Sequence, residues 1–144
     1  MKFTVLQSVY KNDNPVFFSQ SLQSIAENSV QSYSVVLVKD GTLTPELESV
    51  ISEWKDKLPL KVVGYEKNQG LAHALNYGLQ FVETELVARM DSDDIAYKNR
   101  FEKQITYMKE NPEIALSSGY ISEFNDNDMI PKSIRRVPLL YVDK

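Results

Sequence analysis

The chain has 144 residues, enough for one domain that buries a core without disulfides or metal ions. Its 16 Lys and Arg and 20 Asp and Glu residues give a net charge of -4 with no basic stripe, so no nucleic-acid partner is expected. The absence of cysteine excludes disulfide frameworks, thiolate zinc sites and Cys nucleophiles. The apolar run at the N-terminus is interrupted at Gln7 and Lys11, too early for a signal peptide or a membrane span, so a soluble protein is expected.

Three strand-like runs are each followed by a segment in which apolar residues recur at helical spacing. The predicted strands cover residues 3–10, 33–40 and 60–66, and the predicted helices cover 15–29, 45–58 and 71–82. Pro15 suits the first turn of the first helix, and Thr44 or the turn at Gly41 precedes the second. The stripes that should face the sheet are Phe18, Leu22 and Ile25, then Leu47, Val50, Ile51 and Trp54, then Leu71, Ala74, Leu75 and Leu79.

The alternation continues in the second half of the chain. A strand over 85–90 leads into an acidic cluster, a helix over 97–112 follows, and residues 114–124 are predicted as a fifth strand. The segment 126–144 has turn residues without a clear period, which predicts a loop and an irregular tail. The fourth helix should pack through Phe101, Ile105 and Met108. This order predicts an α/β fold: a Rossmann-like, open, mostly parallel sheet with helices on both faces, in three α/β/α layers.

Ligands of such folds bind at the carboxyl ends of the strands. That rule predicts a rim formed by residues 8–11, 39–41, 68–70 and 91–94. In this rim Asp91 and Asp93 have a spacing that can present carboxylate oxygens to Mg2+ or Mn2+. A solvated acidic turn with Asp94 as a helix cap explains the spacing equally well. A calcium loop and a haloacid-type phosphatase fit less well, because the loop lacks its glycine and the pair lies late in the chain.

Other polar residues of the rim have both a functional and a structural interpretation. Asp40 precedes Gly41 and is by itself most simply a turn residue, and Tyr10 could stack on a base or merely pack. The turn at Asn68 and Gly70 precedes a helix whose free N–H groups could face a phosphate. Arg89 and Arg100 flank the acidic cluster, where they could neutralise it or hold a diphosphate. A structural role is the simpler interpretation for Arg100 and for His73.

Taken together, these segments resemble the family 2 glycosyltransferases, which have the GT-A fold. The resemblance rests on VLQSVYKNDNPVFFSQSLQSI, VVLVKDGT, NQGLAHALNYGL, VARMDSDDI and NRFEKQITYMKENPEIALSSG, which occur in the order and spacing typical of that family. It implies that Asp91 and Asp93 form the metal-binding Asp-x-Asp, with Asp94 as a further candidate. It also implies that Asp40 contacts the base and that Tyr10 lies near it.

The resemblance further implies an inverting transferase with a nucleotide-diphosphate sugar as donor, a glycan or lipid-linked acceptor, and Mn2+ or Mg2+ as cofactor. A role in bacterial surface polysaccharide synthesis is expected, in the cytoplasm or at the inner face of the membrane, with peripheral membrane association of the full-length protein. The residues predicted to bind the nucleotide sugar are Ser8, Tyr10, Asp40, Asn68, Gly70, Asn76, Arg89 and Asp91. The rival interpretations are a non-catalytic nucleotide-sugar-binding module and a sugar-phosphate nucleotidyltransferase.

Two departures from the family pattern bear on function. Lys39 stands where the family often has a first aspartate before Asp40. The later carboxylate that deprotonates the acceptor has no convincing counterpart, so the catalytic base is expected beyond Lys144, with Glu123, Asp126 and Asp128 as fallback candidates. We therefore expect a donor-binding domain over residues 1–125, followed at 126–144 by the start of an acceptor-binding region, and a chain that is incomplete for catalysis.

Overall fold

The structure is a computed structural model that describes residues 2–125 and 128–136. The chain divides into two compact units, residues 1–105 and 106–144. The first unit contains a four-stranded, wholly parallel sheet in the order β3-β2-β1-β4. Its strands are β1 (Phe3–Val9), β2 (Ser34–Asp40), β3 (Leu60–Tyr65) and β4 (Leu86–Met90), and its helices are α1 (Pro15–Ala26), α2 (Pro45–Trp54), α3 (Leu71–Leu79) and the first part of α4 (Arg100–Glu110).

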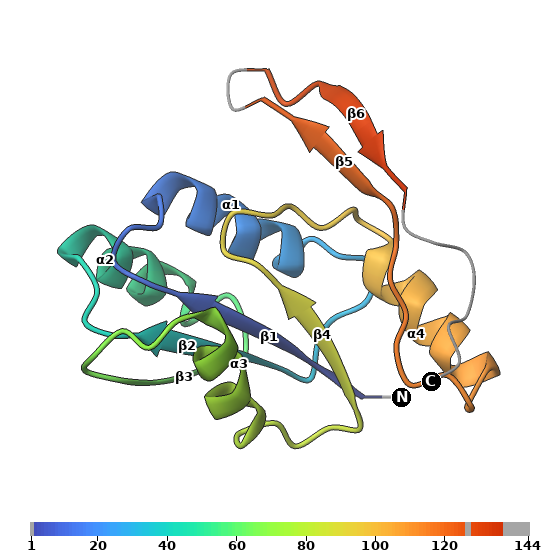
Figure 1. The fold of residues 1–144 in the computed structure, drawn as a ribbon, viewed down its shortest axis with the longest axis horizontal. Coiled ribbons are helices and arrows are strands. Elements are labelled where there is room, and N and C mark those ends of the chain that lie inside the picture. The colour runs from blue at the N-terminus through green and yellow to red at the C-terminus, as the bar shows by residue number, and fades with distance from the viewer. Residues whose placement is uncertain (1, 126–127, 137–144) are drawn as a thin grey trace. The chain divides into compact units, whose positions relative to one another are not determined.

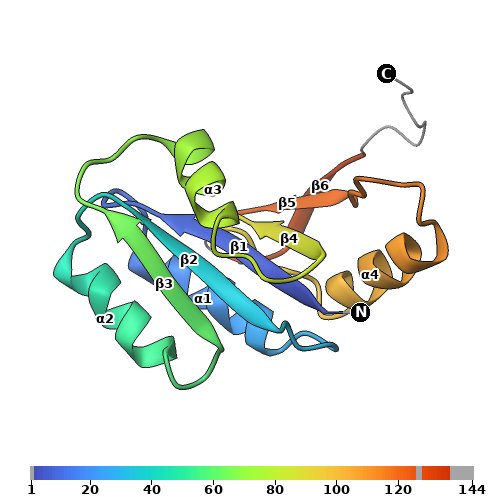
Figure 2. The same ribbon diagram turned by 90° about the horizontal axis from the view of Figure 1, so that it is seen from below.

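Helices cover both faces of this sheet, which confirms the predicted α/β/α layers (Figures 1 and 2). On one face α1 and α2 pack on alternate residues of β1 and β2, and the start of α4 joins them through Phe101 and Ile105. On the other face α3 packs on the intervening residues. The larger core is formed by Phe3, Val5, Val9, Val35, Leu37, Phe18, Leu22, Ile25, Leu47, Ile51, Trp54 and their neighbours, and the smaller one by Leu6, Val36, Val38 and Ala74.

Local sequence signals explain where the first two helices begin. The Asn14 side chain accepts a hydrogen bond from the Val16 amide at 2.8 Å, and Pro15 occupies the first turn of α1. Thr44 caps α2 in the same way, which confirms one of the two predicted starts. The predicted stripes of α1 and α2 are confirmed, with Val50 only partly buried. All four helices are shorter than predicted, by three to five residues in total at their ends.

The predicted stripe of α3 is partly wrong. Ala74 is buried and Leu75 packs beside it, as predicted, but Leu71 and Leu79 are each 48% exposed. Gly78, which was not part of the predicted stripe, is buried with Ala74. A Cβ atom on Gly78 would lie 2.5 Å from Leu6 Cδ1, so the missing side chain lets the helix approach β1 closely.

The second unit differs from the sequence prediction at both of its strands. The predicted fifth strand over 114–124 shrinks to β5 (Ile121–Phe124), and it is not part of the parallel sheet. The segment predicted as a loop contains a strand, β6 (Pro131–Arg135), which pairs with β5 in an antiparallel hairpin. In this hairpin the Glu123 carboxylate accepts hydrogen bonds from Ser133 and Arg135, which hold its pKa below the usual range. Asp126 and the end of the tail, residues 137–144, lie outside the described residues.

Candidate functional site

A cleft of about 340 Å³ lies where the strands of the first unit end. The chain runs outward from β1 to β2 and β3, and then returns through α3 to β4 on the other side of β1. The connections therefore diverge between β1 and β4, which is the position where ligands bind in open α/β sheets. The cleft is lined by Ser8, Tyr10, Asp13, Asp40, Asn68, Gly70, Leu71, Asp91, Ser92 and Asp93.

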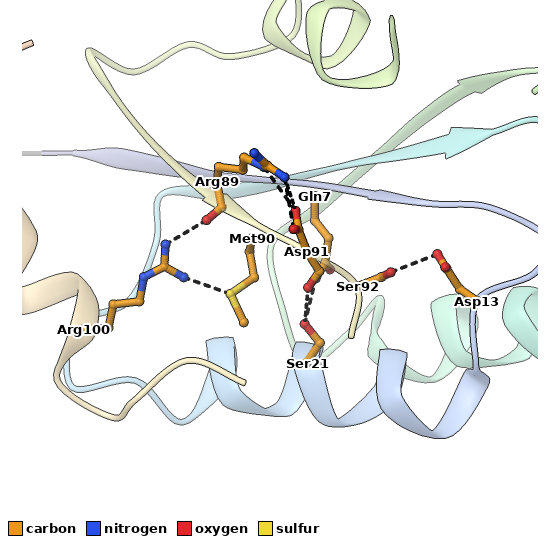
Figure 3. A network of polar contacts seen from close by, with 8 residues as sticks. All are labelled: Gln7, Asp13, Ser21, Arg89, Met90, Asp91, Ser92 and Arg100. Atoms are coloured by element: carbon orange, nitrogen blue, oxygen red, sulfur yellow. Dashed lines mark hydrogen bonds and ion pairs between the residues drawn. The ribbon is translucent and has the colours of Figure 1, made fainter. Parts of the chain in front are cut away.

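The turn that follows β4 is held by side chains on two of its residues (Figure 3). The Arg89 guanidinium lies 2.9 Å and 3.0 Å from the two carboxylate oxygens of Asp91, an ion pair between half-exposed side chains. The buried Ser92 hydroxyl donates a 2.9 Å hydrogen bond to Asp13 in the β1–α1 loop. Because Asp13 also accepts a hydrogen bond from the Tyr10 amide at 3.0 Å, it connects the turn to the end of β1.

The next residue, Asp93, is held by none of these contacts. It is exposed, it lines the cleft, and among the described residues no hydrogen-bond or ion-pair partner contacts its carboxylate. Asp94 follows with its amide 3.3 Å from the Asp91 carbonyl, and its side chain does not line the cleft. Burial raises the pKa of Asp94, and the charges of Asp91 and Asp93 raise it further. Asp94 is not a helix cap, since α4 begins only at Arg100.

Asp40 at the end of β2 has the opposite surroundings. It is 5% exposed, and its carboxylate accepts hydrogen bonds from the Gln69 amide at 2.7 Å, the Gly70 amide at 3.0 Å and the Asn68 side chain at 2.9 Å. Asp40 thus holds the loop between β3 and α3 against the end of β2. Its contact with a base stays a prediction, and most of its acceptor capacity is already used within the protein.

Two glycines and a tyrosine lie close to Asp40 in the sequence or in space. Gly41 and Gly70 both have a φ of 90°, which side chains rarely adopt. A Cβ atom on Gly41 would also lie 2.7 Å from the Asn68 backbone nitrogen, so the close approach of the two loops requires glycine at that position. The Tyr65 hydroxyl is buried, and among the described residues it has no partner in hydrogen-bond geometry. Burial raises the pKa of Tyr65 to about 12, and the neighbouring Asp40 carboxylate adds to the shift, so this phenol stays protonated.

The structure brings most of the predicted site residues together and leaves three outside. Seven of them line the cleft: Ser8, Tyr10, Asp40, Asn68, Gly70, Asp91 and Asp93. Asn76 is exposed on α3, Asp94 does not line the cleft, and Arg89 contacts Asp91 without lining the cleft itself. The roles of all ten stay predictions. Arg100, for which a structural ion pair was expected, forms none among the described residues; it donates instead to the Arg89 carbonyl at 2.8 Å and contacts Met90.

Three residues that line the cleft were given no role by the sequence analysis: Asp13, Leu71 and Ser92, of which only Ser92 lies within the predicted rim. Asp13 lies in the KNDNP turn after β1, where an aspartate that bonds backbone three residues earlier is a common device, so a signal was present. Leu71 was predicted to face the sheet as part of the apolar stripe of α3. Ser92 lies between two carboxylates that dominate the motif, and its contact with Asp13 spans 79 positions of sequence.

The donor set at the cleft suits a hard divalent cation shared with a ligand. Among residues 2–125 and 128–136, no group of three or more His, Asp or Glu side chains is placed to enclose a metal ion. Mg2+ and Mn2+, however, commonly take one or two carboxylates and complete their coordination with phosphate oxygens and water. The unpaired Asp93 carboxylate, with Asp91 two residues away, fits this second kind of site.

A parallel sheet with a cleft at its switch point defines the class of open α/β proteins that bind ligands at the carboxyl ends of their strands. The model for glycosyl transferase family 2 matches residues 9–142, and the chain belongs to that family. Within it, the chain is 42% identical over 137 residues to UDP-Gal:alpha-D-GlcNAc-diphosphoundecaprenol beta-1,3-galactosyltransferase of Escherichia coli. It is 41% identical over 137 residues to amylovoran biosynthesis glycosyltransferase AmsE of Erwinia amylovora. Each match covers 95% of this chain.

Among solved structures, S. aureus TarS 1-349 in complex with UDP-GlcNAc matches with a TM-score of 0.72 and 25% identity. The match covers 92% of this chain and 38% of that one, and it confirms the predicted GT-A fold. This chain spans about half the length of the two bacterial relatives, 50% and 51%. None of the helices in the described part of the chain is long and apolar enough to cross a membrane.

Proposed function

We propose that this chain binds the nucleotide-diphosphate sugar donor of an inverting glycosyltransferase, which transfers the sugar to a glycan or lipid-linked acceptor in bacterial surface polysaccharide synthesis. The observation that carries the proposal is the Asp93 carboxylate, which has no partner among the described residues and lies on an anchored turn at the switch-point cleft. The name of the E. coli relative includes UDP-Gal and a diphosphoundecaprenol acceptor, and the TarS complex contains UDP-GlcNAc. These names support a uridine nucleotide as the first ligand to test.

In this proposal the nucleotide lies across the cleft from β2 to β4. Tyr10, which is 39% exposed, offers an aromatic surface to the base, and Asp40 also lines the cleft. Ser8 and Asn68 contact the nucleotide, and Gly70 brings backbone close to the diphosphate at the start of α3. We include Asn76 only through the family resemblance, since its position on α3 adds no support.

The acidic turn faces the diphosphate end of the donor. Asp93 holds Mn2+ or Mg2+, and Asp91 becomes a second ligand when it exchanges its ion pair with Arg89 for the cation. Exposed ion pairs contribute about 0–1 kcal/mol, so this exchange costs little. When bound, the cation supplies positive charge that stabilises the leaving diphosphate. We assign Arg89 the role of counter-ion to Asp91, close enough to meet the diphosphate after the exchange.

The test is calorimetric titration of the protein with UDP, with and without Mn2+. We expect Mn2+ to tighten UDP binding and Asp93→Asn to remove most of that gain. Replacement of partners outside the metal's own ligands typically costs 10–100-fold in metal affinity, so loss of a direct ligand should cost at least roughly tenfold. Asp56→Asn is the matched control, because Asp56 is an exposed aspartate in the turn after α2.

Two results would contradict the proposal. The first is UDP binding that Mn2+ does not change, and the second is an Asp93→Asn variant that keeps the full Mn2+ effect. GDP, titrated in parallel, tests the choice of base separately: preference for GDP would leave the metal site intact and correct only the nucleotide.

A further inference from the structure

One residue of β1 breaks the apolar pattern of the face that packs on α1. Phe3, Val5 and Val9 on this face are all buried in the larger core. Gln7 lies between them and is 0% exposed, although it ends in an amide. In the pairing of β1 with β4, Gln7 lies opposite Met90, the last residue before the acidic turn.

The Gln7 amide and a hydroxyl from α1 meet at one backbone oxygen (Figure 3). Gln7 Nε2 donates to the Asp91 carbonyl at 3.0 Å and to Ser21 Oγ at 2.8 Å. Ser21 Oγ in turn donates to the same Asp91 carbonyl at 3.1 Å. The Asp94 amide also lies 3.3 Å from this oxygen, so the carbonyl at the base of the turn has partners from β1, from α1 and from the turn itself.

This arrangement has a cost inside the core. Gln7 Oε1 is buried, and the described residues offer it no hydrogen-bond partner. A buried acceptor without a partner is destabilising, and an apolar side chain of similar shape at the same position avoids the penalty. A glutamine in the interior of β1 is therefore unfavourable by itself. Its Nε2 group, however, donates hydrogen bonds, which a methionine or leucine cannot do.

We propose that Gln7, together with Ser21, is a positioning residue that fixes the Asp91 carbonyl and thereby sets where the turn presents Asp93. The chain leaves the sheet at Met90, so from Asp91 onward no strand ladder holds the backbone. Fixing this carbonyl limits the rotation of the two peptide units that follow. Sites of this kind need their ligands within about 0.5 Å of the working geometry, which requires a supporting layer of contacts.

The inference rests on the proposed function for its consequence in ligand binding, although the geometry itself is independent of any ligand. The inference predicts that the stability of the fold and the coupling between Mn2+ and UDP respond differently to the same replacement. Replacing Gln7 should leave the stability of the fold unchanged or higher, because the unpartnered acceptor disappears. The same replacement should loosen the turn and weaken the coupling between Mn2+ and UDP.

The experiment uses Gln7→Met, which keeps the length and volume of the side chain but cannot donate. Ser21→Ala removes the second donor, and Ser19→Ala is the matched control, since Ser19 on the same helix accepts a hydrogen bond from Trp54 instead. Three quantities are measured for each variant: the thermal midpoint, the amide hydrogen exchange of residues 91–96 without ligand, and the ratio of UDP affinities with and without Mn2+.

For Gln7→Met we expect an unchanged or raised thermal midpoint, with exchange of the Asp94 amide faster by roughly two- to tenfold, the equivalent of one hydrogen bond. The Mn2+ gain in UDP affinity should fall by a similar factor, while affinity for UDP alone stays the same. Ser21→Ala should change exchange and coupling in the same direction, and Ser19→Ala should change neither.

A lower thermal midpoint with unchanged exchange in residues 91–96 would overturn the inference and make Gln7 an ordinary structural residue. If Gln7→Met does not fold, the same two readouts on Ser21→Ala decide the question. If the wild-type protein shows no Mn2+ effect on UDP binding, the proposed function fails, and the exchange measurement still decides whether Gln7 positions the turn.

Discussion

The cleft has an aspartate at the end of β2 and another beyond the end of β4, and their surroundings are opposite. Asp40 is buried, and three donors from one loop bind its carboxylate. Asp93 is exposed, and within the described part of the chain its carboxylate has no partner. Around Asp93 the protein instead anchors the backbone and the neighbouring side chains, through contacts to Asp91 and Ser92.

The difference shows that residue type and position at a strand end do not fix a role. A carboxylate surrounded by donors from its own chain organises a loop, and replacing it should cost stability. A carboxylate that is left free on a fixed backbone is available to a cation, and replacing it should cost binding. The predictions below test this division at Asp40, then at an aromatic neighbour, and finally at a carboxylate with intermediate surroundings.

The largest effect is expected for Asp40→Ala. The variant leaves the Gln69 and Gly70 amides and the Asn68 side chain without their acceptor, although partial exposure of the loop lets water replace some of the bonds. We expect the free energy of unfolding to fall by roughly 2–3 kcal/mol, measured by denaturant titration. Asp93→Ala is the comparison and should stay within about 0.5 kcal/mol of the wild type.

Equal stabilities of Asp40→Ala and Asp93→Ala would contradict the division into a structural carboxylate and a binding carboxylate. A second measurement tests the same division. Amide exchange of residues 68–71 should increase in Asp40→Ala and stay at the wild-type rate in Asp93→Ala, because only the first aspartate holds that loop.

The sequence predicted the parallel sheet and its first two helices because each has a strong local signal. Pro15 and Thr44 mark helix starts, and the stripes of α1 and α2 are made of large apolar residues. The strand β6 carries no such signal, since its sequence PKSIR has no apolar alternation and every one of its residues is exposed. In α3 the contact with the sheet depends on Gly78, a residue whose contribution is the absence of a side chain, and apolarity alone favoured the leucines.

The cleft was predictable as a place because parallel strands bring their carboxyl ends to one edge. Strand ends alone located Tyr10, Asp40 and Asp93 at that edge. The strand ends could not reveal which side chain lacks a hydrogen-bond or ion-pair partner, because that depends on contacts between residues far apart in sequence. Asp13 and Ser92 are 79 positions apart, and no periodicity links them. Gln7 was visible in the sequence as a polar residue that interrupts an apolar run.

A smaller effect is expected for Tyr10→Ala, which tests the proposed base contact just after the end of β1. Loss of an aromatic surface under a base costs about 1–3 kcal/mol in binding at other aromatic platforms, and here we expect the lower half of that range in UDP affinity. Stability should change little, because the Tyr10 side chain is 39% exposed and its hydrogen bond to Asp13 comes from the backbone amide. Calorimetric titration measures the first and thermal unfolding the second.

Tyr33→Ala provides the control for Tyr10→Ala. Tyr33 is similarly exposed, at 47%, and precedes the start of β2, at the end of the sheet away from the cleft. Equal UDP affinities for the wild type and Tyr10→Ala would remove Tyr10 from the site. A comparable loss in Tyr33→Ala would attribute the effect to general changes in the fold.

Asp13 lies between the two extremes, because it is half-buried and accepts two hydrogen bonds, from the Tyr10 amide and the Ser92 hydroxyl. Burial raises its pKa above the ordinary 3.8, the charge of Asp93 adds to the shift, and the two hydrogen bonds oppose it. The folded state therefore binds this proton more tightly than the unfolded state. The stability that Asp13 contributes is fully present below the ordinary pKa and is lost as the pH rises through the raised one.

The smallest predicted effect follows from this direction of the pH dependence of stability. Asn at position 13 can still accept a hydrogen bond through its carbonyl oxygen, but it has no charge to bury. Asp13→Asn should therefore match the wild type in stability near pH 3.5 and exceed it near pH 7, by less than about 1 kcal/mol because the carboxylate is only half-buried. Denaturant titrations of both proteins between these two pH values measure the difference. An advantage that stays constant or shrinks as the pH rises would show that the hydrogen bonds outweigh burial, and would place Asp13 with Asp40 as a carboxylate whose hydrogen bonds the fold needs.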